Sequence, residues 1–343
     1  MRNEVLGSVG WPRALALAAV VALGLVAIVG SGGGGSIEGG ECSFFTNSCV
    51  PVIGPTADAF VFPSRMTAQV GGTATFTATT TAAHPAYQWK RSADSGSNYV
   101  DIPGATGASF TLTSLRLTDD AAVFTVDVSS GNTLVFPPAP ARLAVSSMPS
   151  VVFQDAEFLP ADWATSSIAS PAQNGPTNSE ERATTGGNPD AFRRMTYTLT
   201  AGPSSLRVFN ASQASSYDPS SQGAIYTIDF TEDCIVASSS PSIGSVDSKL
   251  LIQQGARKYT TGPTIACSTP AWLHVATWPS LSVANFVLVD GPACGAGESC
   301  PDFSASGAPL QFGYIRDARQ AASAPAASIV HGIDNWKVTV WRR

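Results

Sequence analysis

The feature that most limits the fold of this chain is a series of short runs in which apolar and polar residues alternate. In the run GGTATFTATT, for example, Ala74, Phe76 and Ala78 occupy every second position. Successive side chains of a β-strand point to opposite faces of a sheet, so this spacing places all three on one face. Similar runs recur as far as the C-terminus, and no stretch keeps a helical period. The sequence therefore predicts an all-β protein made of many short strands.

The length and charge of the chain narrow this class further. Its 343 residues are too many for one small sandwich and suit two domains preceded by a leader. Charged residues make up 13% of the sequence, and the net charge is −6. Basic residues occur at most in adjacent pairs such as the terminal Arg342–Arg343, whereas nucleic-acid binding needs several clustered Lys and Arg side chains. We therefore expect a protein of the extracellular type that has no nucleic-acid partner.

The N-terminal residues 1–31 are predicted to direct export. Arg2 and Arg13 precede the apolar run Ala14–Val29, which is slightly long for a signal peptide and short for a membrane span of about 20 residues. The segment is expected to act either as a cleaved signal peptide or as a membrane tether. It also resembles a bacterial lipoprotein signal, but Ser31 stands at the position of the lipidated cysteine. The chain is therefore expected in the periplasm, at the cell surface or secreted, without a lipid on Ser31.

Residues 32–54 are predicted to form a glycine-rich linker with a small disulfide loop. The chain has six cysteines, and all of them follow the leader. An even number of cysteines in an exported chain favours disulfides. Pairing the close neighbours first gives the predicted bridges Cys42–Cys49, Cys294–Cys300 and Cys234–Cys267. A zinc site is the alternative, but the sequence contains no C-x-x-C spacing.

Residues 55–146 have the pattern of a small sandwich. Trp89 lies in a second strand run, and the stretch LTDDAAVFTVDVSS contains Asp120, Ala122, Phe124 and Val126. This frame resembles the D-x-A-x-Y-x-C pattern of immunoglobulin-like domains, here of the bacterial I-set kind. The resemblance implies a β-sandwich of about 90 residues.

The resemblance also implies two cysteines, but this chain has Ala78 and Val126 at their positions. A disulfide contributes about 2–4 kcal/mol, and burial of Val126 and Phe76 against Trp89 can replace much of that through apolar area. Phe124 lacks the hydroxyl that ties the tyrosine corner to the backbone. We expect this domain to fold without the disulfide and to serve as a spacer. The alternative is a specific protein-binding surface.

Residues 147–343 form the second and larger unit. It opens with SVVFQDAEFLPADW, carries a GGNP turn at 186–189 and ends with IDNW in its final strand run. These features resemble concanavalin-A-like jelly rolls and the related carbohydrate-binding modules. The resemblance implies a jelly-roll β-sandwich whose partner is a polysaccharide or glycoconjugate.

Related jelly rolls include enzymes, but their catalytic pattern is incomplete in this chain. Jelly-roll glycoside hydrolases carry E-x-D-x-x-E on one strand, with the two glutamates as nucleophile and acid/base. In YTIDFTED, Asp229 and Glu232 match, whereas Thr227 replaces the nucleophile. A hydroxyl cannot replace that carboxylate, and neither a G-x-S-x-G elbow nor a phosphate-binding loop occurs. We therefore predict no catalytic residues. A degenerate or unrecognised glycoside hydrolase is the remaining enzyme alternative.

The resemblance also implies a structural calcium ion, because related modules often hold one between their first and last strands. Asp155 and Glu157 near the start of the unit, with Asp334 near its end, supply the oxygen ligands that calcium requires. The alternative is that these carboxylates are solvated loop residues.

The predicted glycan site lies on the last strand. Alternation puts Trp336 on the core face and Trp341 on the opposite face, between Lys337 and Arg343. A flat aromatic ring can stack on a sugar ring while the cations donate hydrogen bonds to its hydroxyls. The alternative is that Trp341 covers the neighbouring strand or the immunoglobulin-like domain.

A long loop adds further candidates for glycan contacts. The stretch VDGPACGAGESCPDFSASGAP contains the polar residues Asp290, Glu298 and Asp302, and a loop of this length in a compact domain is usually functional or disordered. The sequence as a whole favours an exported protein that binds a glycan through its second unit. The alternative is a structural or adhesive protein whose partner is a surface protein.

Overall fold

The structure is a computed structural model, and it describes residues 41–43, 48–50, 58–131, 133–135, 138–240, 246–262, 264–291, 294 and 300–343. The chain divides into two compact units, residues 1–55 and 56–343. In the first unit, β1 (Glu41–Ser43) and β2 (Ser48–Val50) form an antiparallel pair in which Cys42 lies opposite Cys49. The side chains of this pair, the predicted Cys42–Cys49 bridge and the predicted leader lie outside the described residues. None of the described helices is long and apolar enough to cross a membrane.

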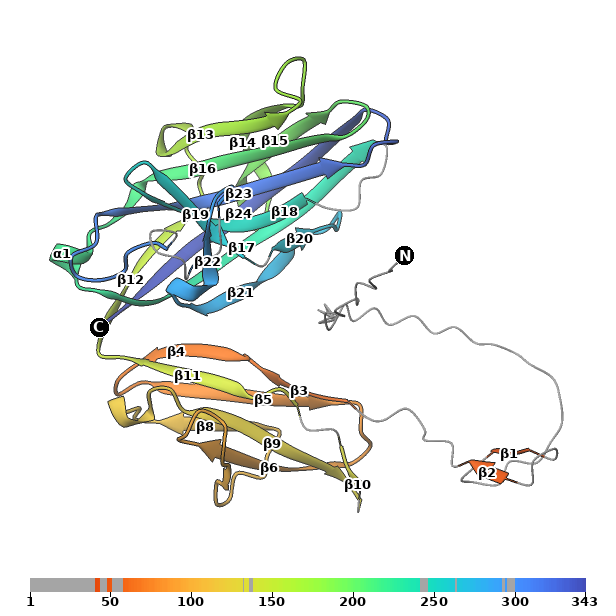
Figure 1. The fold of residues 1–343 in the computed structure, drawn as a ribbon, viewed down its shortest axis with the longest axis vertical. Helices are drawn as coiled ribbons and strands as arrows, with labels where there is room; N and C mark the ends of the chain where they lie inside the picture. The colour runs from red at the N-terminus through yellow and green to blue at the C-terminus, as the bar shows by residue number, and fades with distance from the viewer. Residues whose placement is uncertain are drawn as a thin grey trace, which may run out of the picture. The chain divides into compact units, whose positions relative to one another are not determined.

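The compact unit of residues 56–343 is almost entirely β, as the alternating runs predict, and it contains two sandwiches (Figure 1). The first sandwich has two sheets in the described residues, ordered β4-β11-β9-β6-β7 with β10 on β9, and β3-β5-β8. Its strands are β3 (Ala59–Phe62), β4 (Arg65–Gln69), β5 (Thr73–Thr80), β6 (Pro85–Ser92), β7 (Val100–Asp101), β8 (Ser109–Thr113), β9 (Val123–Ser130), β10 (Thr133–Leu134) and β11 (Ala141–Ser146), with a short 3-10 turn at Leu117–Asp119.

In the core of the first sandwich, buried apolar side chains occupy the positions at which the resemblance implies a disulfide. Trp89 on β6 is fully buried and lies opposite Val126 of β9 in the strand register. Phe76 and Phe124 stack with their ring centroids 5.1 Å apart, and the Trp89 indole N–H donates to the Gly107 carbonyl over 3.0 Å. Ala78 is also buried. The expected apolar replacement for the disulfide is therefore present.

The larger sandwich begins where the first one ends, with β11 finishing at Ser146 and β12 starting at Met148. Its strands are β12 (Met148–Asp155), β13 (Trp163–Ser170), β14 (Thr177–Gly187), β15 (Asp190–Leu199), β16 (Ser204–Tyr217), β17 (Ile225–Ser240), β18 (Val246–Gln254), β19 (Arg257–Thr261), β20 (Ile265–Cys267), β21 (Leu273–Leu281), β22 (Phe286–Leu288), β23 (Leu310–Gln320) and β24 (Ala327–Arg342). One α-helical turn, α1 (Pro219–Gln222), and 3-10 turns at Pro160–Asp162 and Val283–Asn285 complete it.

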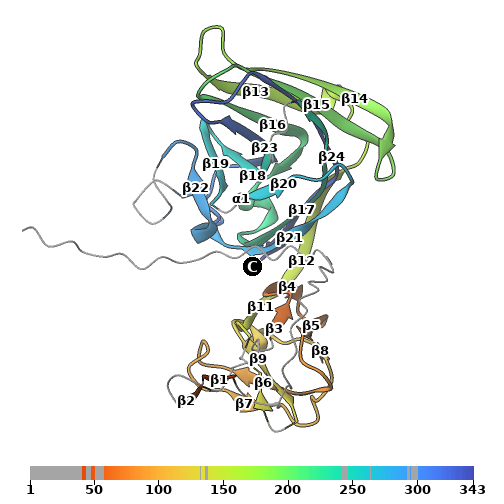
Figure 2. The same cartoon turned by 90° about the vertical axis from the view of Figure 1, so that its right-hand side faces the viewer.

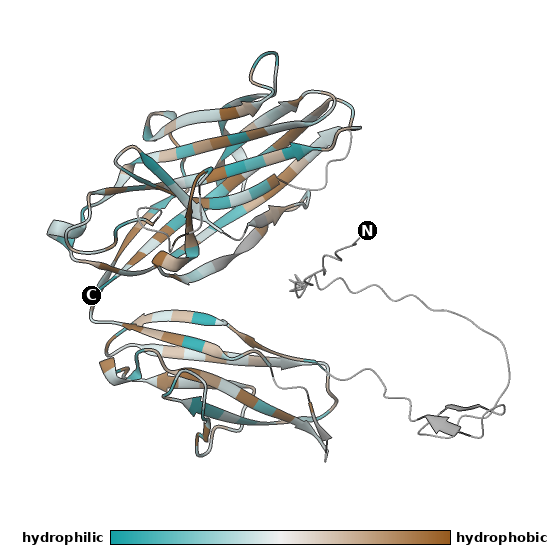
Figure 3. Ribbon diagram, in the orientation of Figure 1, coloured by the Kyte–Doolittle hydropathy of each residue, from teal (hydrophilic) through white to brown (hydrophobic). Residues whose placement is uncertain are grey.

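These strands form two facing sheets in the described residues (Figure 2). The six-stranded sheet is ordered β14-β15-β24-β17-β21 with β12 on β24, and the seven-stranded sheet is ordered β13-β16-β23-β18-β19-β22 with β20 on β18. Apolar and polar residues alternate along many of the strands in Figure 3. On β24, Trp336, Val338 and Val340 are fully buried between the sheets. The predicted all-β class with sandwich-like sheets is confirmed, whereas the predicted domain boundary between residues 146 and 147 stays a prediction.

Two of the predicted disulfides are confirmed. Cys234 of β17 is bonded to Cys267 of β20, and both residues are buried. Cys294 is bonded to Cys300 in the long loop after β22. The bridge Cys234–Cys267 joins the two sheets, because β20 pairs with β18 of the seven-stranded sheet. Cross-linked sulfurs of this kind cannot serve as zinc ligands.

A polar layer interrupts the apolar core of the larger sandwich. Arg316 and Glu232 are fully buried, with 3.0 Å between Nη1 and Oε1, and Arg316 also donates to the Ser248 hydroxyl. His331 is 1% exposed, and its ring packs edge-on against Tyr197 with 4.4 Å between centroids. Neither ring nitrogen of His331 has a hydrogen-bond partner among the described residues. Burial, and secondly the Arg316 charge, hold the pKa of His331 well below its usual value.

This depressed pKa predicts a stability that falls with acid. Below about pH 6.5 the unfolded chain binds a proton at His331 that the folded chain does not, so stability present above that pH is lost as the pH falls, by up to about 1.4 kcal/mol per pH unit. Burial raises the pKa of Glu232, which acts in the opposite direction. We therefore expect the difference in unfolding free energy between the parent and His331→Phe to vary with pH, measured by urea unfolding from pH 5 to 8. His84→Asn, which changes an exposed histidine, is the control. Equal pH slopes for the parent and His331→Phe would contradict this account.

Candidate functional site

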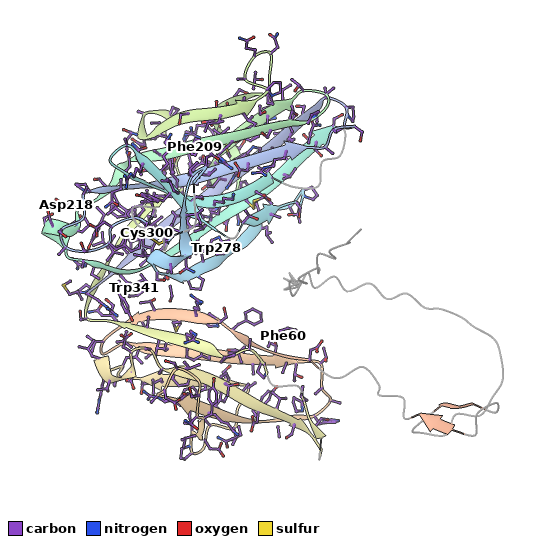
Figure 4. All side chains as sticks on the ribbon, in the orientation of Figure 1. Phe60, Phe209, Asp218, Trp278, Cys300 and Trp341 are labelled. Atoms are coloured by element: carbon purple, nitrogen blue, oxygen red, sulfur yellow. A yellow bond between two sulfur atoms is a disulfide. The ribbon has the colours of Figure 1, made fainter. Side chains whose placement is uncertain are left out.

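The last strand does not present the free aromatic ring that alternation predicts. Trp341 lies on the side of β24 opposite Trp336, as expected, but it is half-buried (labelled in Figure 4). Its indole N–H donates to Oδ2 of Asp229 over 2.7 Å, and Oδ1 of Asp229 accepts the backbone N–H of Ser280 over 2.6 Å. Burial raises the pKa of Asp229, although these two hydrogen bonds lower it. Trp341 therefore covers the neighbouring strand β17, which was the alternative interpretation.

The two cations predicted to flank Trp341 have different surroundings. The Arg343 guanidinium lies 3.6 Å from the ring centroid of Tyr226 and 3.5 Å from a carboxylate oxygen of Asp120. The Tyr226 hydroxyl also donates to Asp120, over 2.5 Å. Lys337 is exposed, and its charge lowers the pKa of Asp229. Arg343 thus lies against Tyr226 and Asp120, with its side chain 59% exposed, and its predicted contact with a glycan stays a prediction.

The two predicted loop residues that the structure describes, Asp290 and Asp302, have different partners. Asp290 accepts a hydrogen bond from Nη1 of Arg207 over 2.6 Å. Asp302 caps a turn by accepting the backbone N–H of Ser304, and its own backbone is bound by Gln254. Glu298 lies outside the described residues. Of the two described residues, Asp290 lines the groove described below.

The predicted calcium ligands are held by protein donors. Asp155 accepts the backbone N–H groups of Glu157 and Phe158 and, over 2.7 Å, the indole N–H of Trp163. Asp334 is fully buried, and it accepts the backbone N–H groups of the residues at 188 and 335. Burial, and then the charges of neighbouring aspartates, raise the pKa of Asp334.

The first and last strands do meet, since Asp155 lies opposite Trp336, but Glu157 instead forms an ion pair with Arg182. Within the described ranges, one group of three ligating side chains comes within 4.8 Å, namely Glu232, Cys234 and Cys267, whose sulfurs are bonded to each other. The predicted set Asp155, Glu157 and Asp334 does not form such a group. Calcium binding therefore stays a prediction.

The hydrolase-like positions on β17 point to different partners. Thr227 is buried and its hydroxyl lies 2.8 Å from that of Thr67 of the first sandwich. Asp229 binds Trp341, whereas Glu232 lies in the core against Arg316. These three side chains do not converge on one point.

One hollow of about 510 Å³ lies on the first sandwich beside Val100, and a run of adjoining hollows lies on the outer face of the seven-stranded sheet. Three hollows of about 290, 430 and 300 Å³ adjoin there. The first two share Ile168 and Asp290, and the last two share Ser166, Phe209 and Lys258. We call this continuous surface the sheet groove. Its other lining residues include Thr165, Arg207, Gln213, Gln253, Arg257, Gln311, Asp317 and Arg319.

Strand alternation builds the floor of the sheet groove. On β16, Leu206 and Val208 face the core, so Arg207 and Phe209 face outward. Phe209 (labelled in Figure 4) lies opposite Ser166 of β13 and Ile315 of β23. A second, outer apolar cluster forms from Phe209, Ala211, Leu251 and Ile315, with Val289 packed against it. The four clustered residues are at most 8% exposed, so they form a buried apolar floor beneath the groove, whereas Ile168, which is 51% exposed, presents apolar surface to solvent.

Ion pairs fix the charged end of the sheet groove. Arg207 bonds to Asp290 over 2.6 Å and to Asp317 over 2.8 Å, and Lys249 approaches Asp317 to 3.1 Å. Burial lowers the pKa of Arg207, but its bonds to Asp317 and Asp290 outweigh that effect and leave the pKa raised. Lys258 lies over the Phe209 ring, 4.3 Å from its centroid, and donates to Ser166 over 3.2 Å. The groove therefore has fixed polar groups above an apolar floor.

The sequence contained one signal of this groove. Leu250, Leu251 and Ile252 are consecutive apolar residues, and so are Val208 and Phe209. Adjacent residues of a strand face opposite sides, so such a run means that both faces of the sheet are partly apolar.

Comparisons with known proteins identify no relative from which a function follows. No protein-family model matches the chain, and no curated protein is similar to it. A chain from a structure on T cell specificity and activation by the bacterial superantigen toxic shock syndrome toxin-1 is 16% identical, with a TM-score of 0.21, and the match covers 26% of this chain and 98% of that one. A marsupial T cell receptor is 15% identical, with a TM-score of 0.22, and the match covers 45% of this chain and 93% of that one.

Proposed function

We propose that this chain is an exported binding protein that holds a polysaccharide or glycoconjugate in the sheet groove. The observation that carries the proposal is the run of three adjoining hollows, lined by amide, hydroxyl and charged side chains over an apolar floor. Amides and hydroxyls can both donate and accept, as sugar hydroxyls require, and the exposed Ile168 offers apolar surface to a sugar ring. The resemblance of residues 147–343 to carbohydrate-binding jelly rolls adds support, although such folds host many functions.

Three further observations support a role in binding outside the cytoplasm. The two disulfides are typical of an oxidising compartment. Thr227 stands where the related hydrolases need a nucleophilic carboxylate, and Glu232 is buried against Arg316. In this proposal the immunoglobulin-like sandwich is the spacer that carries the binding unit, and no step requires catalysis.

A pair of variants tests the position of the site. Gln253 lines the sheet groove, so Gln253→Ala should weaken binding of a soluble polysaccharide by roughly 3- to 10-fold, the effect of losing one hydrogen bond of about 1 kcal/mol. Calorimetry of the exported chain against a neutral β-glucan, dextran and polygalacturonate provides the measurement. The exposed Gln154→Ala on β12 is the matched control. Trp341→Ala discriminates between the two candidate sites, because it should leave the affinity unchanged if the groove is the site. Failure of all these polysaccharides to bind would remove the proposal.

The alternative function is adhesion to a surface protein, and one observation favours it. Phe60 and Phe62 of β3 are 47% and 60% exposed, and β3 is an end strand of its sheet in the described residues. Exposed apolar side chains on an edge strand are a common protein-binding feature. This function becomes the preferred one if no polysaccharide binds.

A further inference from the structure

The cationic side chains of the sheet groove outnumber its carboxylates. Four cations line the three hollows, Arg207, Arg257, Lys258 and Arg319, against the two carboxylates of Asp290 and Asp317. The whole chain has a net charge of −6. Positive charge is therefore gathered locally, in the one concave surface to which we assign ligand binding.

The cations of the sheet groove differ in whether a carboxylate neutralises their charge. Arg207 satisfies Asp290 and Asp317, and Asp317 is further shared with Lys249. Lys258 has a different environment, because its ammonium contacts the Phe209 ring and the Ser166 hydroxyl, neither of which carries a charge. Arg319 is exposed, and its charge acts on Asp247, although within the described residues it forms no ion pair shorter than 4.0 Å. Lys258 and Arg319 are thus cations that a ligand can neutralise.

Lys258 of β19 and Arg319 of β23 lie beside different positions of the strand β16. Lys258 lies over Phe209, and Arg319 is the register partner of Ser205, also on β16. Four residues of β-strand span roughly 13 Å, at about 3.3 Å per residue. Amide side chains of Gln253 and Gln311 line the groove beyond Lys258. A ligand that meets all of these groups must be extended, must offer hydroxyls and must carry anionic groups at intervals.

We propose that the ligand of the sheet groove is an anionic polysaccharide, with carboxylate or sulfate groups that pair with Lys258 and Arg319. The proposal rests on the glycan-binding function argued above and names its substrate class. Ammonium and guanidinium groups donate charge-assisted hydrogen bonds to either anion, and guanidinium also matches the planar carboxylate. The exposed Ile168 side chain and the stem of Lys258, which lies over the buried Phe209 ring, supply the apolar surface for the sugar rings.

The test compares polymers that differ in charge. Dextran and dextran sulfate share a backbone, and polygalacturonate supplies the carboxylate arm. Calorimetry on the exported chain should show at least tenfold tighter binding of one anionic polymer than of dextran, with an affinity that falls as salt is added. Lys258→Gln and Arg319→Gln should each weaken anionic binding about 3- to 10-fold, whereas Lys258→Arg should retain it. Arg142→Gln, an exposed change on β11, is the control.

The possible results distinguish an anionic ligand from glycan binding in general. Dextran or a neutral β-glucan binding as tightly as the anionic polymers would overturn the anionic class and leave glycan binding in place. No binding of any polymer would remove both. Equal binding of single-stranded DNA, with the same loss in Lys258→Gln, would show a general ion-exchange surface and would also overturn the inference.

Discussion

Glu232→Gln is expected to destabilise the protein by about 3–5 kcal/mol, because it leaves the Arg316 guanidinium charged and unpaired in the core. Both side chains are fully buried, and Nη1 and Oε1 are 3.0 Å apart. Glutamine has nearly the same volume as glutamate, so the substitution removes charge without opening a cavity. Nε and Nη2 of Arg316 already lack hydrogen-bond partners in the described part of the chain, so no second acceptor there compensates for the loss. Urea unfolding of the exported chain at pH 7 gives the measurement.

Two further variants sharpen that experiment. Glu181→Gln breaks an ion pair with Arg194 whose side chains are 64% and 47% exposed, and it should cost less than about 1 kcal/mol. The double variant Glu232→Leu/Arg316→Met removes both buried charges, and it should recover most of the loss because desolvation of the pair disappears with it. If the Glu232→Gln protein were as stable as the Glu181→Gln protein, the unpaired Arg316 charge would not carry the expected desolvation penalty.

Local alternation was sufficient to predict the fold class. The spacing of Ala74, Phe76 and Ala78 specifies a strand with one buried face, and all three are buried in the structure. The same reasoning identified the buried side of β24 at Trp336. Such predictions succeed because the period of two depends only on backbone geometry and on which side faces the core. The even number and the spacing of the cysteines likewise sufficed for the two disulfides that the structure describes.

The site was harder to predict because alternation gives a side of a strand and not what covers that side. Trp341 is on the outer side, as expected, but Asp229 of β17 occupies its indole N–H. The sheet groove depends on pairings between distant segments, such as Phe209 with Ile315 and Ser166 with Phe209. Register over such separations is set by the packing of whole sheets and not by any local pattern. Only the consecutive apolar residues of β18 and β16 pointed to the outer apolar floor.

Replacing Cys234 and Cys267 together with alanine is expected to destabilise the chain by about 3–4 kcal/mol. The bridge closes a loop with a sequence separation of 33, and both cysteines are buried in the core. In the chain-entropy account, losing it restores freedom to the unfolded chain, and the cost grows with the length of the loop. The bridge also joins the two sheets of the larger sandwich, so the folded state loses a covalent tie between its layers.

The second bridge is the internal control for this prediction. Cys294–Cys300 has a sequence separation of only 6, so its removal by the matched alanine pair should cost about 2 kcal/mol, less than removal of Cys234–Cys267. Denaturant unfolding of both double variants gives the comparison, and unfolding of the parent with and without reductant checks that the bridges are formed. A long-loop variant that is at least as stable as the short-loop variant would contradict the argument. The sheet groove lies on the seven-stranded sheet that Cys267 ties to β17. Near its unfolding midpoint, the long-loop variant should therefore bind the proposed polysaccharide ligand more weakly. The short-loop variant should keep its affinity at the same temperature.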